Sequence, residues 1–467
     1  MPAGTTVAEI FAFLESIGLP VRFGELTEST FLPGIAVVHG VLTVDEARLL
    51  YPGDLLHEAG HLAVLRPSQR ALVHGSAGND GGFEMAAIAW SWAAAQHIGL
   101  DPAVLFHDAG YRGGAQAIRE NFLAGRYIGV PLLEWAGLTT AATYPALSPW
   151  LRDELGIPHL RRFWNRREDV DWVTTNTLLC GLGMGLKETY DYILRQKPSF
   201  AGFEAWVLAK NGGAIDAARI ERLNMALSEP GKRGEPADPR AEPALSAEDL
   251  AFWDEHGYVI LHDAVPPENC RAAVRAICEF LGVDLDRPET WYGGPQGHSI
   301  WIPLLHHPAI WANRNSPRIH RAFAQLWNRE DLWGTVDQAG FNPPEKPEWQ
   351  FPGPRLHWDV SLARPIPFGV QGILYLTATA AHQGAFTCVP GFHRRIDAWL
   401  ESLPAGADPR KRDFSREAAP IAGRAGDLVI WHHALPHGSS PNGAALPRFV
   451  QYIFKRPSHW GYNPVWV

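Results

Sequence analysis

The chain has 467 residues, and this length predicts two or three domains because one hydrophobic core seldom serves more than about 250 residues. Hydrophobic residues make up 46% of the chain and charged residues 19%, which excludes a mainly disordered protein. The net charge of −9 gives no basic field for nucleic acid or an anionic membrane, so we expect neither partner. The four cysteines form no CxxC pair, which argues against thiolate metal sites and favours a reducing, cytoplasmic location.

The first part of the chain predicts helices around a few strands. We expect no signal peptide, because no basic segment precedes an apolar run, and the most apolar stretch, residues 85–95, is too short to span a bilayer. An apolar stripe predicts a first helix that ends at Gly18, and strand-like sequence follows at 21–45, strongest in GIAVVHGVLTV. We expect Asp54 to cap a helix that carries LLHEAGHLAVL, followed by a helix at about 83–98 and another that begins at Asp101–Pro102.

The helix expected after Asp54 carries an HExxH motif, residues 57–61. Positions i and i+4 share a helix face, so His57 and His61 can bind one zinc ion while Glu58 polarises a bound water. Glu84, which follows on the next expected helix, is the candidate third ligand. The pattern resembles a minimal zincin, although the Asn-Glu pairing and following Asp usual at that glutamate are missing. Gly60 costs helix stability, which predicts that another segment approaches it closely.

Several alternatives remain open for this motif. Glu84 near a helix start would also favour the helix dipole, the HEAGH segment would also suit a solvated helix face, and a bound metal would also suit a structural role without hydrolysis. Five other residues compete as the third ligand: His74, Asp80, His97, His107 and Asp108.

The clearest boundary is the segment 228–245, which holds four prolines and seven charges and no aromatic or β-branched residue. Such a segment cannot bury enough surface to offset its ordering entropy, so it predicts a linker. We therefore expect a multidomain α+β protein with an HExxH zincin-like domain at 1–149, a helical subdomain at 150–227, the linker, and a last domain at 246–467.

The last domain is expected to be an antiparallel β-sandwich with leading helices. It opens with a helix at 246–256 that Ser246 caps, and then changes to short runs rich in β-branched and aromatic residues. The strongest of these runs are PFGVQGILYLTATAA, GDLVIWHH and PRFVQYIFK. Gln371 and Tyr375 alternate with apolar neighbours in the first run, so they face either a site or the core.

Three residues of this domain fit a ferrous iron site. His357 and Asp359 are two positions apart, and on a strand such residues point to the same face. His437 comes much later in the chain, next to GDLVIWHH. Two histidines and one carboxylate leave three coordination positions open, as in non-haem Fe(II) oxygenases. Arg448 offers a guanidinium that can bind a dicarboxylate co-substrate through two hydrogen bonds.

Taken as an ordered set, FWDEHGYVILHDAV, LHWD, GAFTCVPGFH and GDLVIWHHALPHGSSPN with the arginine after it resemble the phytanoyl-CoA dioxygenase (PhyH-like) family of Fe(II)/2-oxoglutarate oxygenases. The resemblance covers residues 246–467 and implies a double-stranded β-helix, a jelly-roll of the cupin-like kind. It implies iron on His357, Asp359 and His437, 2-oxoglutarate held by Arg448 with help from Ser439, and consumption of dioxygen. Trp358 is bulkier than the family pattern leads us to expect, which bears on the shape of the co-substrate wall.

Other interpretations of these residues remain open. His357 and Asp359 would also suit a buried hydrogen-bonded pair without metal, His432 or His433 would also suit the position of His437, and Arg448 would also suit a surface ion pair. His393 is expected to be structural rather than a ligand. The sequence thus predicts an oxygenase that oxidises a small molecule, with an HExxH domain that binds zinc and hydrolyses an amide-type bond. The alternative is a zinc metallopeptidase whose last domain is a non-catalytic binding module.

Overall fold

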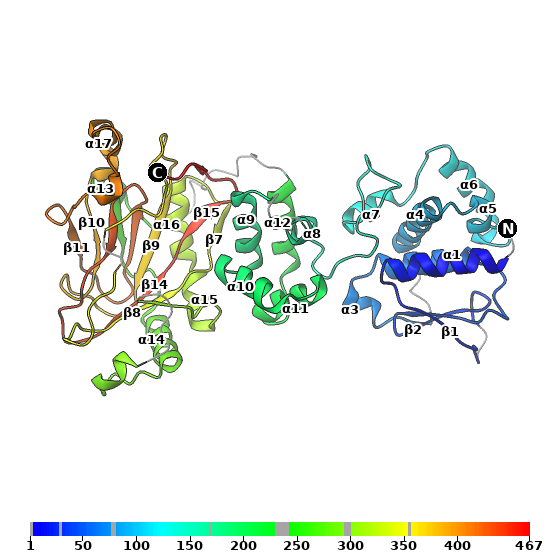
Figure 1. Ribbon diagram of the computed structural model, residues 1–467, viewed down its shortest axis with the longest axis horizontal. Coiled ribbons are helices and arrows are strands. Elements are labelled where there is room, and N and C mark those ends of the chain that lie inside the picture. The colour runs from blue at the N-terminus through cyan, green and yellow to red at the C-terminus, as the bar shows by residue number, and fades with distance from the viewer. Residues whose placement is uncertain are drawn as a thin grey trace. The chain divides into compact units, whose positions relative to one another are not determined.

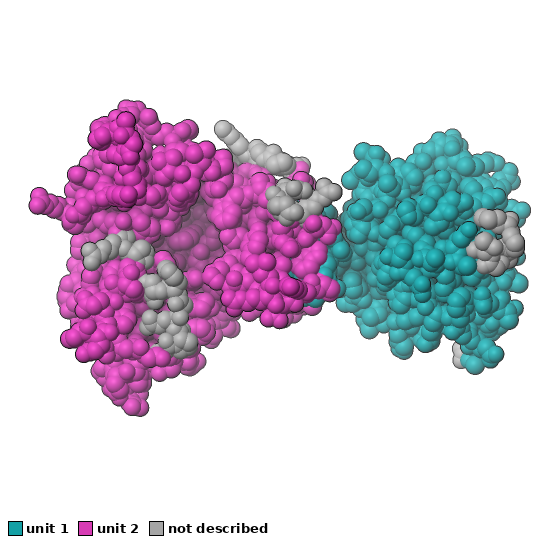
Figure 2. Space-filling model, viewed as in Figure 1, with its two compact units in different colours: residues 1–161, 200–204 teal, residues 162–199, 205–467 magenta. Residues whose placement is uncertain are grey.

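The computed structural model describes residues 3–27, 30–75, 81–165, 167, 170–228, 242–293, 300–353 and 356–467. The chain divides into two compact units, residues 1–161 with 200–204 and residues 162–199 with 205–467 (Figure 2). The helices expected as a separate subdomain therefore group mostly with the C-terminal half, and most of the expected linker lies outside the described residues. A search of the described helices finds none that could cross a membrane.

The first unit packs helices against a small four-stranded sheet (Figure 1). The strand order is β1-β3-β2-β4, and β1 pairs with β3 in parallel while the other neighbours are antiparallel. The strands are β1 (Val21–Phe23), β2 (Ile35–Val38), β3 (Val41–Val44) and β4 (His74–Gly75). The helices wholly within this unit are α1 (Ala3–Ser16), α2 (Asp54–Ala63), α3 (Pro67–Arg70), α4 (Gly81–Ile98), α5 (Pro102–Leu105), α6 (Ala115–Leu123) and α7 (Val130–Trp135).

In this unit one local prediction is refined and another is wrong. The strand-like run GIAVVHGVLTV is a hairpin, because His39 and Gly40 both have positive φ, 50° and 76°, and form the tight turn between β2 and β3. Asp54 is not the cap of α2: Gly53 holds that position, and the Asp54 carboxylate instead lies 3.1 Å from Nε2 of His107. The helix predicted at 83–98 is confirmed as α4, and Asp101 caps α5 as expected.

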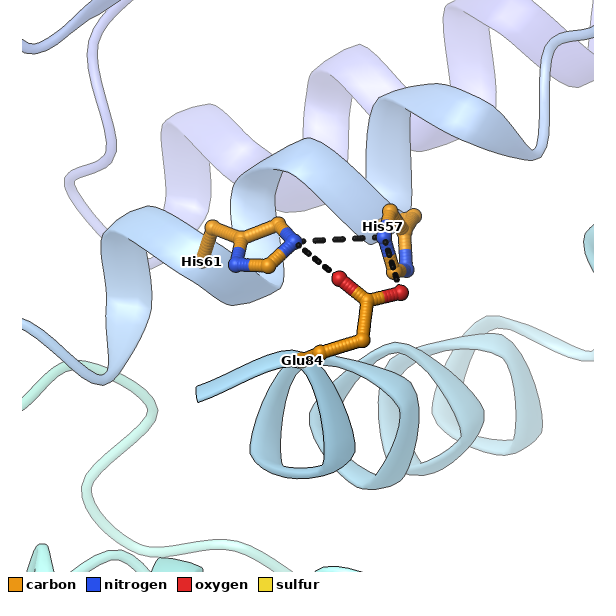
Figure 3. Close-up of side chains that lie close together, drawn as sticks. All are labelled: His57, His61 and Glu84. Atoms are coloured by element: carbon orange, nitrogen blue, oxygen red, sulfur yellow. Dashed lines mark hydrogen bonds and ion pairs between the residues drawn. The ribbon is translucent and has the colours of Figure 1, made fainter. Parts of the chain in front are cut away.

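The close approach predicted at Gly60 is confirmed. A Cβ atom on Gly60 would lie 2.7 Å from the carbonyl oxygen and 3.0 Å from the Cα of Ala87, so α2 and α4 meet here backbone to backbone. This contact brings the first turn of α4 next to the face of α2 that carries His57 and His61 (Figure 3).

The second unit is built on antiparallel sheets of six strands, ordered β5-β12-β9-β14-β8-β6, and three strands, ordered β11-β10-β13, with a small β15-β7 pair. The predicted runs are confirmed as β9 (Val370–Tyr375), β12 (Leu428–His432) and β14 (Arg448–Tyr452). The other strands are β5 (Tyr258–Leu261), β6 (Trp301–Ile302), β7 (Leu332–Gly334), β8 (Ala339–Asn342), β10 (Phe386–Cys388), β11 (Ala419–Ile421), β13 (His437–Ser439) and β15 (Lys455–Pro457).

Alternation along the strands of the six-stranded sheet separates two apolar cores. Leu374 and Leu428 belong to one core together with residues of α14 (Pro267–Leu281) and α16 (Pro317–Trp327). Ile373 and Val429, each one position along, belong to the other core together with Phe386 of the three-stranded sheet. The expected sandwich architecture is therefore confirmed, and its inner face is the one that carries Ile373.

Some of the helices that precede the sandwich in the chain contact it. The cap of α13 (Ala247–His256) is Ser246, as predicted. Arg222 of α12 donates a 2.8 Å hydrogen bond to the carbonyl oxygen of Leu332 at β7, and Thr177 of α9 bonds the carbonyl oxygen of Ser458. The remaining helices are α8 (Pro158–Asn165), α9 (Trp172–Leu182), α10 (Leu186–Gln196), α11 (Phe200–Lys210), α12 (Ala217–Ser228), α15 (Pro308–Arg314) and α17 (Ile396–Ser402).

Candidate metal centres

The predicted iron ligands converge in the second unit. Nε2 of His357 lies 3.2 Å from Oδ1 of Asp359, and Nε2 of His437 lies 3.3 Å from Oδ2 of the same carboxylate. Each residue offers one ligand atom, and these atoms lie within 4.8 Å of one another. His357 and His437 also pair through two backbone hydrogen bonds of 2.9 and 3.0 Å, which form an isolated bridge rather than the strand expected at residue 357. The arrangement suits one divalent ion.

The neighbouring histidines have other partners. Nδ1 of His432 accepts a hydrogen bond from the Ala434 amide, and the His433 ring contacts the carbonyl oxygen of Pro367. Burial lowers the pKa of His432 to about 3 and that of His433 to about 4. Neither ring is part of the cluster, so the geometry favours His437 over both alternatives.

Partial burial raises the pKa of the Asp359 carboxyl, but hydrogen bonds with His357 and His437 outweigh it, so the pKa lies below its ordinary value. The carboxylate is therefore ionised at neutral pH, which is the form that binds a metal ion. Its Oδ2 atom also accepts a 2.9 Å hydrogen bond from Nε2 of Gln371. Gln371 thus faces the site, whereas the Tyr375 hydroxyl is buried and donates to the carbonyl oxygen of Ile421.

A cavity of about 170 Å³ adjoins the cluster, and all three cluster residues line it. Half of the other lining residues are aromatic. The aromatic and aliphatic ones are Trp301, Ile373, Phe386, Trp431, Tyr452 and Phe454, with Asp337, Gln338, Gly438 and Ser439 as the remaining lining residues. Apolar side chains offer water few hydrogen-bond partners, so the cavity suits a ligand with a substantial apolar part.

Arg448 is completely buried and belongs to no surface ion pair. Its Nη1 donates to the carbonyl oxygen of Gly384 at 2.5 Å and to Oγ of Ser439 at 3.1 Å. Its Nε and Nη2 atoms are buried and have no hydrogen-bond partner among the residues that the structure describes. A buried guanidinium with unused donors is costly unless an anion satisfies it, and Ser439, which it contacts, lines the cavity.

Trp358 does not line the cavity, so its bulk does not alter the shape of the cavity wall. The side chain is 4% exposed and packs against Phe392, Trp399 and Phe414, while its Nε1 donates to the carbonyl oxygen of Ala434. Residues next to each other along an extended chain point to opposite sides, so the same geometry that directs His357 and Asp359 to the site directs Trp358 into the core.

The first unit contains a second cluster of the same composition (Figure 3). Glu84 reaches from the first turn of α4 to both histidines of α2: Oε1 lies 3.3 Å from Nε2 of His57, and Oε2 lies 3.2 Å from Nε2 of His61. The two Nε2 atoms are 3.2 Å apart. Hydrogen bonds with the two rings lower the pKa of Glu84 well below its usual range. The structure therefore brings together the three side chains predicted as zinc ligands.

The competing third ligands lie elsewhere. His107 pairs with Asp54 and stacks on Tyr51 with ring centroids 3.9 Å apart, and His97 packs against Phe13. Neither these residues nor His74 or Asp108 join the cluster, and Asp80 lies outside the described residues.

Two further ionisable side chains, Glu58 and Tyr111, lie near this cluster. Burial raises the pKa of the Glu58 carboxyl, and Glu58 lines a cavity of about 490 Å³ together with the strand β2. The Tyr111 hydroxyl lies 3.5 Å from Nδ1 of His57, the ring nitrogen that faces away from Glu84. The sequence analysis did not single out Tyr111. The one sequence signal there is a glycine-rich segment, and in the structure Tyr111, Arg112 and Gly113 all adopt positive φ.

Comparisons with known proteins agree with the resemblance seen in the sequence. The profile of the phytanoyl-CoA dioxygenase (PhyH) family matches residues 253–450. A Dictyostelium discoideum protein, provisionally described as a phytanoyl-CoA dioxygenase, is 24% identical over 43% of this chain and 73% of its own length. Ava biosynthesis cluster protein O of Aspergillus versicolor is 21% identical over 44% of this chain and 77% of its own.

Among solved structures, the non-haem alpha-ketoglutarate-dependent carbocyclase SnoK from nogalamycin biosynthesis is similar to this chain. It is 19% identical, with a TM-score of 0.33, over 48% of this chain and 90% of its own.

Proposed function

We propose that residues 246–467 form an Fe(II)/2-oxoglutarate-dependent oxygenase that oxidises a small-molecule substrate. Two lines of support are independent of each other. The family profile covers the segment that contains all three candidate ligands and Arg448. The side-chain geometry supplies two imidazoles and one carboxylate on one side of an apolar cavity.

The observation that carries the proposal is the unused donor capacity of Arg448 beside the cluster. A metal site alone does not require a buried guanidinium, but a dicarboxylate co-substrate does. Among the described residues two buried nitrogens of Arg448 have no hydrogen-bond partner, and Ser439, which accepts a bond from Nη1, lines the same cavity as His437. The residues therefore fit both iron and 2-oxoglutarate.

In this proposal each group has a defined task. His357, Asp359 and His437 would hold the iron, and Arg448 with Ser439 would hold the distal carboxylate of 2-oxoglutarate. When bound, iron and 2-oxoglutarate together supply the oxidation of an unactivated C–H bond by dioxygen. The aromatic walls, among them Phe386 and Phe454, exclude water and hold the substrate against the cluster.

The test is spectroscopic. Purified chain is mixed anaerobically with Fe(II) and 2-oxoglutarate, and a weak visible charge-transfer band should appear. Asp359→Ala should abolish this band, because one of the three ligands is lost. A wild-type chain without the band, or an Asp359→Ala variant that retains it, contradicts the oxygenase assignment. Substrate-dependent succinate release across a metabolite panel then identifies the substrate class.

We also propose that His57, His61 and Glu84 bind zinc and that this site hydrolyses an amide-type bond. The supporting observation is the convergence of the Glu84 carboxylate on both Nε2 atoms. Glu58 follows His57 directly in the HExxH motif, so it is the candidate general base. If only this site proves active, the chain is instead a zinc hydrolase with a non-catalytic sandwich.

Glu58→Gln separates metal binding from hydrolysis. Glutamine keeps the shape of the side chain but cannot accept a proton, so zinc content should be unchanged while hydrolysis of amide reporters falls about 100- to 10,000-fold. Zinc content is measured after dialysis, with His61→Ala as the variant that should lose zinc. Hydrolysis retained by Glu58→Gln removes Glu58 from the mechanism, and zinc retained by His61→Ala removes the site.

A further inference from the structure

We infer that Gln371 is a positioning residue for the iron site, which it serves by fixing the orientation of the Asp359 carboxylate. This inference rests on the proposed function, because it concerns the same three ligands. It starts from one hydrogen bond, in which Nε2 of Gln371 donates to Oδ2 of Asp359 at 2.9 Å.

Asp359 needs such support more than the other two ligands do. His437 belongs to the strand β13, and His357 pairs with it through the backbone bridge. Asp359 lies beyond that bridge in a bend with no strand pairing, and its side chain is 50% exposed. A carboxylate on such a segment can rotate and shift, and metal binding weakens when the ligand oxygen leaves its required position.

Gln371, by contrast, stands on a rigid element. It belongs to β9, which lies between β12 and β14 in the six-stranded sheet, and its Cα is paired with that of Trp431. Gln371 is two positions before Ile373, so it shares the inner face of the sandwich. The hydrogen bond therefore connects a ligand on an irregular segment to the middle of the sheet.

The orientation of the Gln371 amide is determined by this contact alone. Only the NH2 group can face an ionised carboxylate, because the amide oxygen would be repelled. Its Oε1 is buried and has no hydrogen-bond partner in the described part of the chain, so no bond there selects this orientation. Removing a residue that hydrogen-bonds to a metal ligand typically lowers metal affinity about 10- to 100-fold. Gln371 thus holds Oδ2 while the carboxylate faces both histidines.

The test is an anaerobic titration of Fe(II) in the presence of saturating 2-oxoglutarate, followed by the charge-transfer band. Gln371→Met keeps length and removes the amide, and Gln371→Asn keeps the amide but is too short to reach Asp359. Both should raise the Fe(II) concentration at half-maximal band by about 10- to 100-fold and shift the position of the band. The matched control is Gln451→Met on β14, where the glutamine bonds Ile310 and Asn313 and touches no cluster residue.

The outcomes distinguish this inference from the proposed function. If a folded Gln371→Met or Gln371→Asn variant binds Fe(II) with wild-type affinity and an unshifted band, the positioning role is wrong while the oxygenase assignment stands. If the wild-type chain gives no band, or Asp359→Ala does not abolish it, the oxygenase assignment itself fails. If Gln451→Met weakens Fe(II) binding as much as Gln371→Met, the effect is a general one on the sheet and the inference is overturned.

Discussion

The two units carry clusters of identical composition, two histidines and one carboxylate, on unrelated scaffolds. In the first unit the histidines are one helical turn apart on α2, and Glu84 comes from the start of α4. In the second unit the first histidine and the carboxylate are two positions apart on an irregular segment, and His437 comes from β13. In both clusters the ligand atoms lie within 4.8 Å of one another. The ligand set alone therefore does not distinguish their chemistry.

The surroundings of the clusters do distinguish it. The second cluster has a buried cation with unused donors, Arg448, and an aromatic cavity. The first has a partly buried carboxyl of raised pKa, Glu58, directly after a candidate ligand. A cation with unused donors suits an anionic co-substrate, whereas a carboxyl next to a metal-bound water suits proton transfer. The groups around the candidate metal ligands thus determine which chemistry each unit is suited to.

The largest expected effect tests this contrast at Arg448. Arg448→Ala should raise the 2-oxoglutarate concentration needed for half-maximal band formation by about 30-fold or more, because a buried charge-assisted pair is worth about 2–5 kcal/mol. The measurement is a 2-oxoglutarate titration of the Fe(II)-loaded chain without oxygen. Arg448→Lys should recover only part of the affinity, since lysine keeps the charge but loses the second parallel hydrogen bond.

The control for this experiment is Arg424→Ala, whose guanidinium is solvent-exposed beside Asp263 and Asp427. It should leave the 2-oxoglutarate titration unchanged. Unaltered 2-oxoglutarate binding by Arg448→Ala would remove the main difference between the two clusters.

Short-range periodicity explains which parts of the sites the sequence predicted. The i, i+4 spacing of His57 and His61 and the i, i+2 spacing of His357 and Asp359 specify a shared face once the local conformation is known. The three strongest apolar runs of the last domain likewise became strands of one sheet. The zincin resemblance placed Glu84 on the next helix, and in the structure Glu84 lies in the first turn of α4, which packs on α2 at Gly60.

The rest depended on contacts between segments distant in the sequence. The alternation around Gln371 left open whether it faces a site or the core, and its partner Asp359 is 12 residues away. Tyr111 reaches His57 from a 3-10 turn 54 residues later. The unused nitrogens of Arg448 appear only when all neighbours of the side chain are known. The cap predicted at Asp54 is wrong because the carboxylate pairs with His107, which comes from a distant part of the first unit. No periodic pattern encodes such partners.

An intermediate effect is expected for the scaffold of the first cluster, at Gly60. Gly60→Ala should lower the unfolding temperature of the first unit, because its methyl group would overlap the Ala87 backbone. Overpacking costs about 1–3 kcal/mol, more than the gain of about 1 kcal/mol from helix propensity. Zinc affinity should fall as well, since α4 carries Glu84. Gly81→Ala, where a Cβ meets nothing within 4 Å, is the matched control and should leave both quantities unchanged.

The smallest expected effect concerns Tyr111, the counterpart of Gln371 in the first cluster. Its hydroxyl is 3.5 Å from Nδ1 of His57, a longer contact than the 2.9 Å bond of Gln371, so it should contribute less. Tyr111→Phe keeps the ring and should weaken zinc binding about tenfold, at the lower end of such effects. Competition with a chelator in an Asp359→Ala background measures this site without interference from the other cluster.

Tyr144→Phe provides the comparison for that measurement, because it removes another buried hydroxyl of the same unit, one that donates to the carbonyl oxygen of Ala89. It should reduce thermal stability without changing zinc affinity. If Tyr111→Phe behaves in the same way, the hydroxyl only stabilises the fold. A polar side chain that positions a candidate ligand is then a feature of the cluster in the second unit and not of the cluster in the first. If zinc affinity falls selectively, both clusters rely on a polar partner outside the ligand set, and the parallel between them extends beyond composition.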